Sequence, residues 1–258
     1  MLWTRREILY RVRFVELAYE GAKVSMKLSI IVPCYNEAKN IPLILNRFKE
    51  KIKWDDIELI LVNNGSTDDS QDVMETLLPG YPFARIEKVE INQGYGFGIL
   101  SGLRSAKGEY LAWTHADMQT DPYDAIKALE LIEKAPNPVK TFVKGNRKGR
   151  QLMDNFFTWG MGVFENFYLG VSLNDINAQP NLFHHSFFEK WDNPPYDFSL
   201  DLYAFYMARR YNLEVIRFPV FFAERIHGHS HWNFGWRSKW KFIKRILDFS
   251  LKLKKRLN

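Results

Sequence analysis

The chain has very little cysteine and no long apolar run. A single cysteine among 258 residues, Cys34, excludes a disulfide framework and a cysteine-rich zinc site, and it is typical of a reducing compartment. No stretch approaches about 18 uncharged apolar residues, so we expect no membrane-spanning helix. The balance of 46% hydrophobic and 26% charged residues is that of an ordinary globular protein, which excludes a disordered chain, a collagen and a coiled coil.

Positive charge is concentrated at the C-terminus. The whole chain has a formal net charge of +6, of which residues 236–258 carry +8 and the remainder −2. Apolar residues recur in this segment at helical spacing, with lysines and arginines on the other face. A basic amphipathic helix of this kind either lies in an anionic membrane surface or packs on the protein body, and both interpretations stay open. A single basic helix is weak support for nucleic-acid binding, and we expect none.

Two further segments are unusual. Residues 1–25 alternate arginines with apolar residues but lack the uncharged core of a secretory signal, so we treat them as a leader of uncertain status, with Met26 as an alternative start. Residues 156–169 are crowded with aromatic side chains, which either fill a core or contact lipid head groups. The expected organisation is a leader over 1–25, one domain over 26–235 and a basic helix over 236–258.

Strands and helices alternate over about the first 145 residues. This pattern predicts a single α/β domain with a mostly parallel central sheet flanked by helices. Polar residues follow three of the strands, at 33–40, 63–69 and 115–121, and parallel sheets bind ligands at this carboxyl edge. The predicted strands are 28–33, 57–62, 84–91, 109–114, 139–144 and 213–220, and the predicted helices are 41–51 (capped by Asn40), one opening at Ser66, 98–106, 122–133 and 196–211.

Three motifs in this order carry a family resemblance. They are SIIVPCYNE at 29–37, LVNNGSTD at 61–68 and HADMQ at 115–119. With them, residues 26–235 resemble the family-2 glycosyltransferases of the GT-A fold. The Asp-Met-Gln motif, the sequence Gly-Asn-Arg at 145–147 and residues 225–230 narrow the resemblance to the dolichyl- or polyprenyl-phosphate sugar synthases.

The resemblance implies an inverting, metal-dependent glycosyltransferase of cell-surface glycan synthesis. Its donor would be a nucleotide-diphosphate sugar, and its acceptor a polyprenyl phosphate or another lipid-linked molecule. The expected location is cytoplasmic, peripheral on the inner face of the plasma membrane. Alternatives are a glycosyltransferase with a soluble acceptor and a catalytically weak scaffold that binds nucleotide sugars.

The resemblance also implies that Asp117 and Gln119 are the ligands of Mg²⁺ or Mn²⁺, with Asp117 also a catalytic and donor-binding residue. Hard cations prefer oxygen ligands, and side chains at positions i and i+2 of an extended segment point to the same side. Relatives often carry an acid where this chain has His115. Asp121 is the nearby carboxylate that would compensate.

Nucleotide-binding residues are implied in three segments. In the second segment, at 63–64, two amides replace the two acids usual in the family, and amides still hydrogen-bond a base edge. The third is a glycine-rich turn at 92–98, which either offers backbone N–H groups to a phosphate or opens a helix where small residues are needed. The residues are Pro33, Tyr35, Glu37, Asn63, Asn64 and Gly94.

Arg147 and Arg225 are the catalytic candidates on the acceptor side, because guanidinium forks match phosphate geometry. Residues 223–231 resemble a loop that closes over the diphosphate, and they add His227, Ser230 and His231 as further candidates.

A phosphate acceptor needs no general base, whereas a hydroxyl acceptor does. Asp197 and Asp201 are the carboxylates to test as that base, and their other interpretation is a charge at a helix N-terminus. Asp175 is expected, on resemblance alone, to support the acceptor loop.

Overall fold

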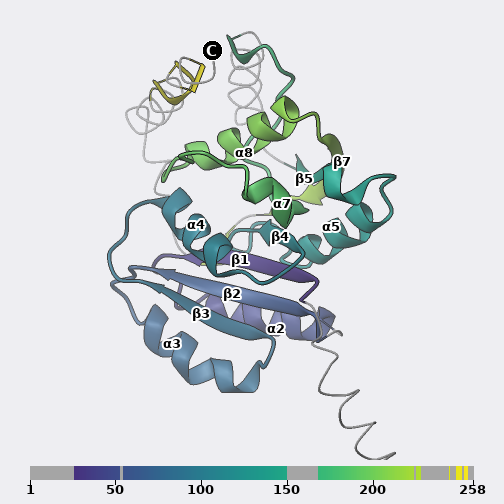
Figure 1. Cartoon of the computed structure of the whole chain (residues 1–258). Coiled ribbons are helices and arrows are strands. Elements are labelled where there is room, and N and C mark those ends of the chain that lie inside the picture. Colours follow the sequence, from purple (N-terminus) through teal and green to yellow (C-terminus); the bar gives the residue numbers. More distant parts are fainter. Residues whose placement is uncertain are drawn as a thin grey trace, which may run out of the picture.

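The computed structural model describes residues 26–52, 55–149, 168–223 and 225–227, together with seven positions at 244, 248–251 and 253–254. A seven-stranded sheet forms its centre (Figure 1). The strands are β1 (Leu28–Cys34), β2 (Ile57–Asn64), β3 (Ala84–Val89), β4 (Tyr110–Trp113), β5 (Thr141–Lys148), β6 (Asn181–His184) and β7 (Glu214–Phe221). The helices are α2 (Ile41–Lys51), α3 (Ser70–Leu77), α4 (Tyr95–Ser105), α5 (Asp124–Glu133), α7 (His185–Phe188) and α8 (Ser199–Arg210), with 3₁₀ turns at Leu78–Gly80 and Pro138–Lys140.

The strand order is β3-β2-β1-β4-β6-β5-β7. Strands β3, β2, β1 and β4 pair in parallel, as do β5 and β7, whereas β6 runs antiparallel to both of its neighbours. All eight residues of β2 are buried, as expected for a central parallel strand covered on both faces. The mostly parallel, helix-flanked sheet predicted from the sequence is therefore confirmed.

Two apolar clusters cover the two faces of the sheet. One joins the sheet to α4, α7 and α8, and the other joins it to α2, α3 and α5. Helix α2 shows why: its buried residues Ile41, Ile44, Leu45 and Phe48 recur at helical spacing on one side. This three-layer arrangement leaves the loops after β1, β2 and β4 together at the carboxyl edge.

Several predicted boundaries need correction. Asn40 occupies the N-cap position of α2 but makes no capping hydrogen bond. Its Nδ2 donates to Glu37 Oε2 at 2.6 Å, and its Oδ1 has no partner among the described residues. Helix α3 begins at Ser70 rather than Ser66, and Asp68 Oδ1 accepts the Ser70 N–H at 3.0 Å just before it. Helix α4 begins three residues earlier than predicted, at Tyr95.

The sequence did not predict β6 or α7. Each has four residues, too few to show a period, and β6 enters the sheet antiparallel between β4 and β5. Its partners lie far away in the sequence, so local pattern carries little information about it.

The predictions for the two ends lie largely outside the described residues. The leader at 1–25 and all but Tyr168 and Leu169 of the aromatic segment are among them. In the C-terminal segment the seven described positions are helical. Leu253 is buried and Phe249 packs against the α8-side cluster, and Lys254 Nζ donates to the Tyr168 carbonyl at 2.7 Å. Among the helices that the structure describes, none has the length and apolarity needed to cross a bilayer.

Candidate active site

The loops after β1 and β2 are joined by hydrogen bonds. The Asn36 N–H donates to Ser66 Oγ at 3.1 Å, and Asn36 Oδ1 accepts the Thr67 N–H at 2.8 Å. The Glu37 N–H donates to Ser70 Oγ at 2.9 Å. Asn36 has φ +58°, a left-handed conformation that asparagine tolerates better than most residues. The sequence around Asn36 therefore fixes the first loop on the second.

This pair of loops presents most of the predicted nucleotide-binding residues. Pro33 lies half-buried near the end of β1, and Tyr35 is exposed beyond it. Glu37 is partly buried, and burial raises the pKa of its carboxyl, with the negative charge of Asp117 adding to the shift and Asn40 and Arg225 opposing it. Glu37 and Asp117, from different loops, therefore share one electrostatic neighbourhood.

Asn63 and Asn64 are both buried at the end of β2. Asn63 Nδ2 donates to Gln71 Oε1 at 2.5 Å, and Asn63 Oδ1 accepts the Ser66 N–H at 3.0 Å. Asn64 Nδ2 donates to the Gly94 carbonyl at 3.0 Å, whereas Asn64 Oδ1 has no partner among the described residues. A carboxylate at 64 could not donate to Gly94, so the amide suits this contact and leaves one oxygen available as an acceptor.

The glycine-rich turn packs against backbone. Gly94 has φ +117°, and a Cβ there would lie 2.5 Å from the Tyr196 carbonyl oxygen. Its N–H donates to Asn92 Oδ1 at 2.8 Å. A Cβ at Gly96 would lie 2.6 Å from the carbonyl oxygens of Pro195 and Asp197. These contacts favour a helix-entry turn that needs small residues over a phosphate cradle at Gly94.

Asp117 and Gln119 lie in the loop after β4. The Asp117 side chain is largely buried, and its Oδ1 accepts the Gln119 N–H at 3.1 Å. Its Oδ2 lies 2.9 Å from Arg225 Nη2, and Gln119 Oε1 accepts from Arg225 Nε at 3.1 Å. The two predicted ligand oxygens thus face one positive group. The segment is not extended as predicted, since Met118 has φ +57°, and the tight turn itself brings the two side chains together.

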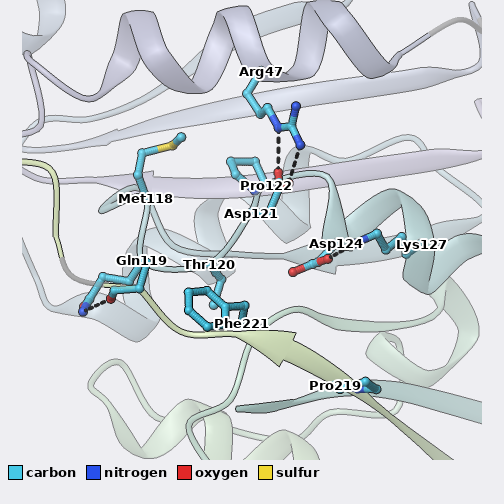
Figure 2. A pocket seen from close by; sticks show the side chains of 11 residues that line it. Arg47, Met118, Gln119, Thr120, Asp121, Pro122, Asp124, Lys127, Pro219 and Phe221 are labelled. Carbon is cyan, nitrogen blue, oxygen red and sulfur yellow. Dashed lines mark hydrogen bonds and ion pairs between the residues drawn. The ribbon is translucent and has the colours of Figure 1, made fainter. Parts of the chain in front are cut away.

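The carboxylate of Asp121, which we expected to compensate for His115, is instead paired with Arg47. Arg47 Nε donates to Asp121 Oδ1 at 2.9 Å and Arg47 Nη2 to Asp121 Oδ2 at 2.5 Å. Burial alone would raise the pKa of the Asp121 carboxyl, but the hydrogen bonds from Arg47 and the Tyr123 N–H outweigh it and lower that pKa. Figure 2 shows Asp121 directed toward Arg47, in a pocket of about 520 Å³ that Gln119 also lines.

His115 precedes this loop, half-buried, with its ring 5.9 Å from that of Tyr95. Burial lowers the pKa of His115, and the positive charges of Arg147 and Arg225 lower it further against the opposing effect of Asp117 and Asp201. Burial thus favours the neutral form of His115. That form offers a hydrogen-bond donor or a neutral ligand and supplies no negative charge.

Arg147 is fixed by Asp175. The Arg147 N–H donates to Asp175 Oδ2 at 2.9 Å, Arg147 Nε donates to Asp175 Oδ1 at 2.8 Å, and Nη2 also contacts Oδ1. Both side chains are largely buried. Burial opposes ionisation of Asp175, but Arg147 outweighs it and lowers the pKa of that carboxyl. Asp175 thus holds both the backbone and the guanidinium of Arg147 in place.

The remaining acceptor-side candidates are less well placed. His227 is exposed, and Ser230 and His231 lie outside the described residues. Asp197 Oδ1 accepts the Ser199 N–H at 2.9 Å at the start of α8, which favours the helix-terminus interpretation. Asp201 is buried in the first turn of α8 and is the acceptor of a polar network.

The sequence of the chain decides its family. The sequence model of glycosyl transferase family 2 matches residues 29–211, which is well over half of the chain. The chain belongs to this family. The resemblance stated from the three motifs is confirmed.

Similar proteins of known sequence are transferases. The glycosyltransferase is 29% identical over 133 residues to an undecaprenyl-phosphate 4-deoxy-4-formamido-L-arabinose transferase of Yersinia enterocolitica, a match covering 50% of this chain and 40% of that protein. It is 30% identical over 126 residues to the protein of the same name from Serratia proteamaculans, covering 47% and 38%. The match thus spans about two fifths of the length of these curated relatives.

Solved structures show the same fold. The glucosyl-3-phosphoglycerate synthase of Mycobacterium tuberculosis, in complex with Mn²⁺, UDP and glucosyl-3-phosphoglycerate, matches with a TM-score of 0.67 at 16% identity, over 90% of this chain and 81% of that one. A mannosyltransferase from Pyrobaculum calidifontis, in complex with GDP-Man and Mn²⁺, matches with a TM-score of 0.61 at 18% identity, over 92% and 68%. The GT-A fold is thereby confirmed.

A buried polar network beneath the site escaped the sequence analysis. The Lys144 side chain on β5 is inaccessible to solvent, and its Nζ donates to the Ala178 carbonyl and to Asn181 Oδ1, both at 2.7 Å. Asp201 Oδ1 accepts from Gln179 Nε2 at 2.8 Å, and also from Asn181 and Trp113. The available signal was Lys144 itself, a lone charge inside a predicted buried strand.

This network reaches the site through one aromatic side chain. Gln179 Nε2 donates to Tyr95 Oη at 3.1 Å. The Tyr95 ring stacks on Phe198 with centroids 4.7 Å apart and an interplanar angle of 11°, and its other neighbour is the His115 ring. In this glycosyltransferase the Tyr95 ring beside His115 is therefore fixed by a hydrogen bond from the buried polar network.

Proposed function

We propose that this glycosyltransferase transfers a sugar from a nucleotide-diphosphate donor to a polyprenyl-phosphate or other lipid-linked acceptor, with a divalent cation and with inversion at the anomeric carbon. The observation that carries the proposal is the convergence of the Asp117 and Gln119 oxygens with Arg225 at the carboxyl edge of the sheet. Family membership, the names of the curated relatives and the ligands of the similar solved structures support it.

The residues present suit Mg²⁺ or Mn²⁺. A carboxylate and an amide oxygen are ligands that hard cations accept, and both oxygens already face a positive group. Within the described part of the chain, no group of three or more His, Cys, Asp or Glu side chains could hold a metal. The set of two protein ligands thus fits a cation that takes its other oxygens from water and substrate phosphates. A bound cation would neutralise the charge that develops on the departing diphosphate.

Arg147 is the residue that we propose for the acceptor phosphate. Its guanidinium is fixed by Asp175 and lies 5.4 Å from the centroid of the Phe222 ring, so its orientation is set before any ligand arrives. The charges of Arg147 and Asp117 both act on His115, which supports a role for Arg147 close to the proposed cation site. A guanidinium fixed in this way would orient the phosphate without paying much further ordering entropy.

The environment of the aspartates supports a phosphate acceptor over a hydroxyl acceptor. An ionised phosphate attacks without a general base. Asp201 is buried beneath three side-chain donors, and Asp197 caps the start of α8, so neither is poised to take a proton from a substrate. Inversion then needs no nucleophile from the chain, since the acceptor oxygen displaces the diphosphate in one step.

On the donor side, Asn64 Oδ1 is the acceptor that we propose for an N–H group of the nucleotide. It is buried and lacks a partner among the described residues, and an unmet buried acceptor is costly unless a ligand satisfies it. Tyr35, exposed in the loop after β1, would contribute stacking or a hydrogen bond.

Peripheral attachment to the inner face of an anionic membrane is part of the proposal. Its support is the lipid-linked acceptor and the +8 charge of residues 236–258. Sedimentation of the full chain with vesicles containing anionic phospholipid should decrease as salt is raised. Sedimentation independent of lipid charge would contradict the electrostatic part of the proposal.

The test of the proposed function is a thermal-shift panel of nucleoside diphosphates with and without Mn²⁺. A nucleotide present at about 100 times its dissociation constant adds about 2.7 kcal/mol to stability. We expect one nucleotide to give a larger shift with Mn²⁺, and transfer from the matching sugar nucleotide to undecaprenyl phosphate to require the cation. Absence of a nucleotide response, or equal transfer in EDTA, would contradict the proposal.

The rival function is a catalytically weak scaffold that binds nucleotide sugars. In its favour, this chain has the uncharged residues Asn63 and Asn64, and His115, at positions where the family resemblance leads us to expect acids. Tight, saturable donor binding without transfer or hydrolysis would favour the scaffold.

A further inference from the structure

Arg225 contacts the same two side chains that we propose as metal ligands. Its Nη2 lies 2.9 Å from Asp117 Oδ2, and its Nε donates to Gln119 Oε1 at 3.1 Å. The Arg225 side chain is 25% exposed and that of Asp117 10%, so water screens this pair only partly. The guanidinium therefore contacts Asp117 Oδ2 and Gln119 Oε1, the two oxygens that a divalent cation would bind.

Two hydrogen bonds join Gln119 to Ala223, two residues before Arg225. The Ala223 N–H donates to the Gln119 carbonyl at 2.7 Å, and Gln119 Nε2 donates to the Ala223 carbonyl at 3.1 Å. The Gln119 amide is thus oriented with its nitrogen toward Ala223 and its oxygen toward Arg225. The Arg225 guanidinium thus orients the Asp117 and Gln119 oxygens before any metal binds.

The charges around Arg225 explain why a positive group is needed there. Glu37 and Asp117 are two carboxylates in one neighbourhood: the charge of Asp117 opposes ionisation of Glu37, whereas Arg225 favours the ionised form of Glu37. A cation between them relieves their repulsion. A guanidinium and a divalent cation at the same Asp117 and Gln119 oxygens would repel each other, so each weakens the binding of the other there.

We propose that Arg225 is a resident counter-cation: it holds Asp117 and Gln119 while no metal is bound, and its guanidinium leaves these oxygens when a divalent cation binds. The inference rests on the proposed function, since it requires Asp117 and Gln119 to be the ligands. Metal binding and the position of Arg225 are then coupled, and coupling is reciprocal. An anion that draws Arg225 away, such as a diphosphate, strengthens metal binding.

The first test measures Mn²⁺ affinity by EPR titration of the full chain without nucleotide. Arg225→Gln should bind Mn²⁺ about fivefold or more tightly than the wild type. Arg104→Gln is the matched control, because Arg104 is an exposed arginine in the last turn of α4, at the opposite edge of the sheet, and it should leave the affinity unchanged. Equal or weaker affinity in Arg225→Gln would overturn the inference.

Asp117→Asn separates this inference from the proposed function. Loss of Mn²⁺ binding in Asp117→Asn, with no gain in Arg225→Gln, refutes the counter-cation role and leaves the metal ligands standing. Unchanged Mn²⁺ binding in Asp117→Asn refutes the metal site itself. Thermal unfolding of each variant shows whether it is folded.

A second readout follows the segment that carries Arg225. Cys34 is buried and is the sole cysteine of the chain, so Ile226→Cys, at a 55% exposed position, can be labelled selectively with a nitroxide. Mg²⁺ alone, which is diamagnetic, should change the mobility of the label in this protein, and the change should vanish when Asp117→Asn is added. A spectrum unaffected by Mg²⁺, at a concentration that displaces Mn²⁺ in competition, would overturn the inference.

Discussion

The side of the site that we propose for the donor and the side that we propose for the acceptor are held together by different chemistry. On the proposed donor side, the loops after β1 and β2 are joined mainly by amides, hydroxyls and backbone groups, as between Asn36 and Ser66 or Asn36 and Thr67. On the acceptor side, the contacts are ion pairs, between Arg147 and Asp175 and between Arg225 and Asp117.

This difference has a consequence for ligand binding. We expect the neutral hydrogen bonds within the proposed donor loops to keep their partners when a nucleotide binds. An ion pair can exchange its carboxylate for a phosphate, because both present oxygens to the same guanidinium. On the proposed function, the donor side would then stay fixed, and charge would be redistributed on the acceptor side.

The largest expected effect comes from Asp117→Ala, which removes the carboxylate at the boundary of the two sides. Transfer should fall by at least about a hundredfold, the usual cost of losing a group that stabilises developing charge. The Mn²⁺-dependent part of the nucleotide thermal shift should vanish. Asp121→Ala is the control from the same loop, since Asp121 binds Arg47 instead, and it should retain transfer.

The second expected effect distinguishes a buried ion pair from an exposed one. Asp175→Asn leaves the Arg147 guanidinium, 9% exposed, without its charged partner, and should lower the free energy of unfolding by about 3 kcal/mol. Asp121→Asn breaks a pair whose side chains are 32% and 34% exposed, and should cost about 1 kcal/mol or less. Urea denaturation measures both, and equal losses would remove the distinction.

The third concerns Lys144, beneath the acceptor side. Burial lowers the pKa of Lys144 to about 7, although Asp201 opposes the shift. The unfolded state then binds more protons above pH 7, so this residue makes stability rise with pH between 7 and about 10. Lys144→Met should flatten the part of that rise between pH 7 and pH 9 by about 2 kcal/mol in urea unfolding. An unchanged pH dependence would show that Lys144 keeps its proton.

The smallest expected effect lies in the donor frame. Ser66→Ala removes the acceptor of the exposed Asn36 N–H, which water can replace, so the free energy of unfolding should fall by about 0.5 kcal/mol. Nucleotide binding should weaken only slightly. A loss of free energy of unfolding as large as that of Asp175→Asn would contradict the comparison, because a neutral hydrogen bond would then contribute as much as a buried ion pair.

Much of the fold was predictable because it depends on local pattern. Helix α2 was predicted at its observed bounds, since its apolar residues recur at one period between an asparagine and a charged end. Strand β2 was predicted from a continuous buried run. Strand β6 was missed because its place depends on pairing with β4 and β5, and four residues carry no periodic signal.

The site was predictable as motifs but not as contacts. Asp117 and Gln119 stand out within five residues of sequence. Their partner Arg225 is separated from Gln119 by 106 positions, and Asp175 from Arg147 by 28. Which arginine meets which carboxylate depends on how β5, β7 and the following loop meet at one edge, and no local propensity encodes that.

The central claim is that Asp117 and Gln119 hold a divalent cation under the donor diphosphate. Anomalous diffraction from crystals of the full chain grown with Mn²⁺ and the nucleoside diphosphate that shifts its melting tests this most directly. The expected result is one Mn²⁺ peak bonded to Asp117 and Gln119 oxygens and to the diphosphate, with Arg225 moved off both. A peak bound elsewhere, or a diphosphate seated with Asp117 still paired to Arg225, would contradict it.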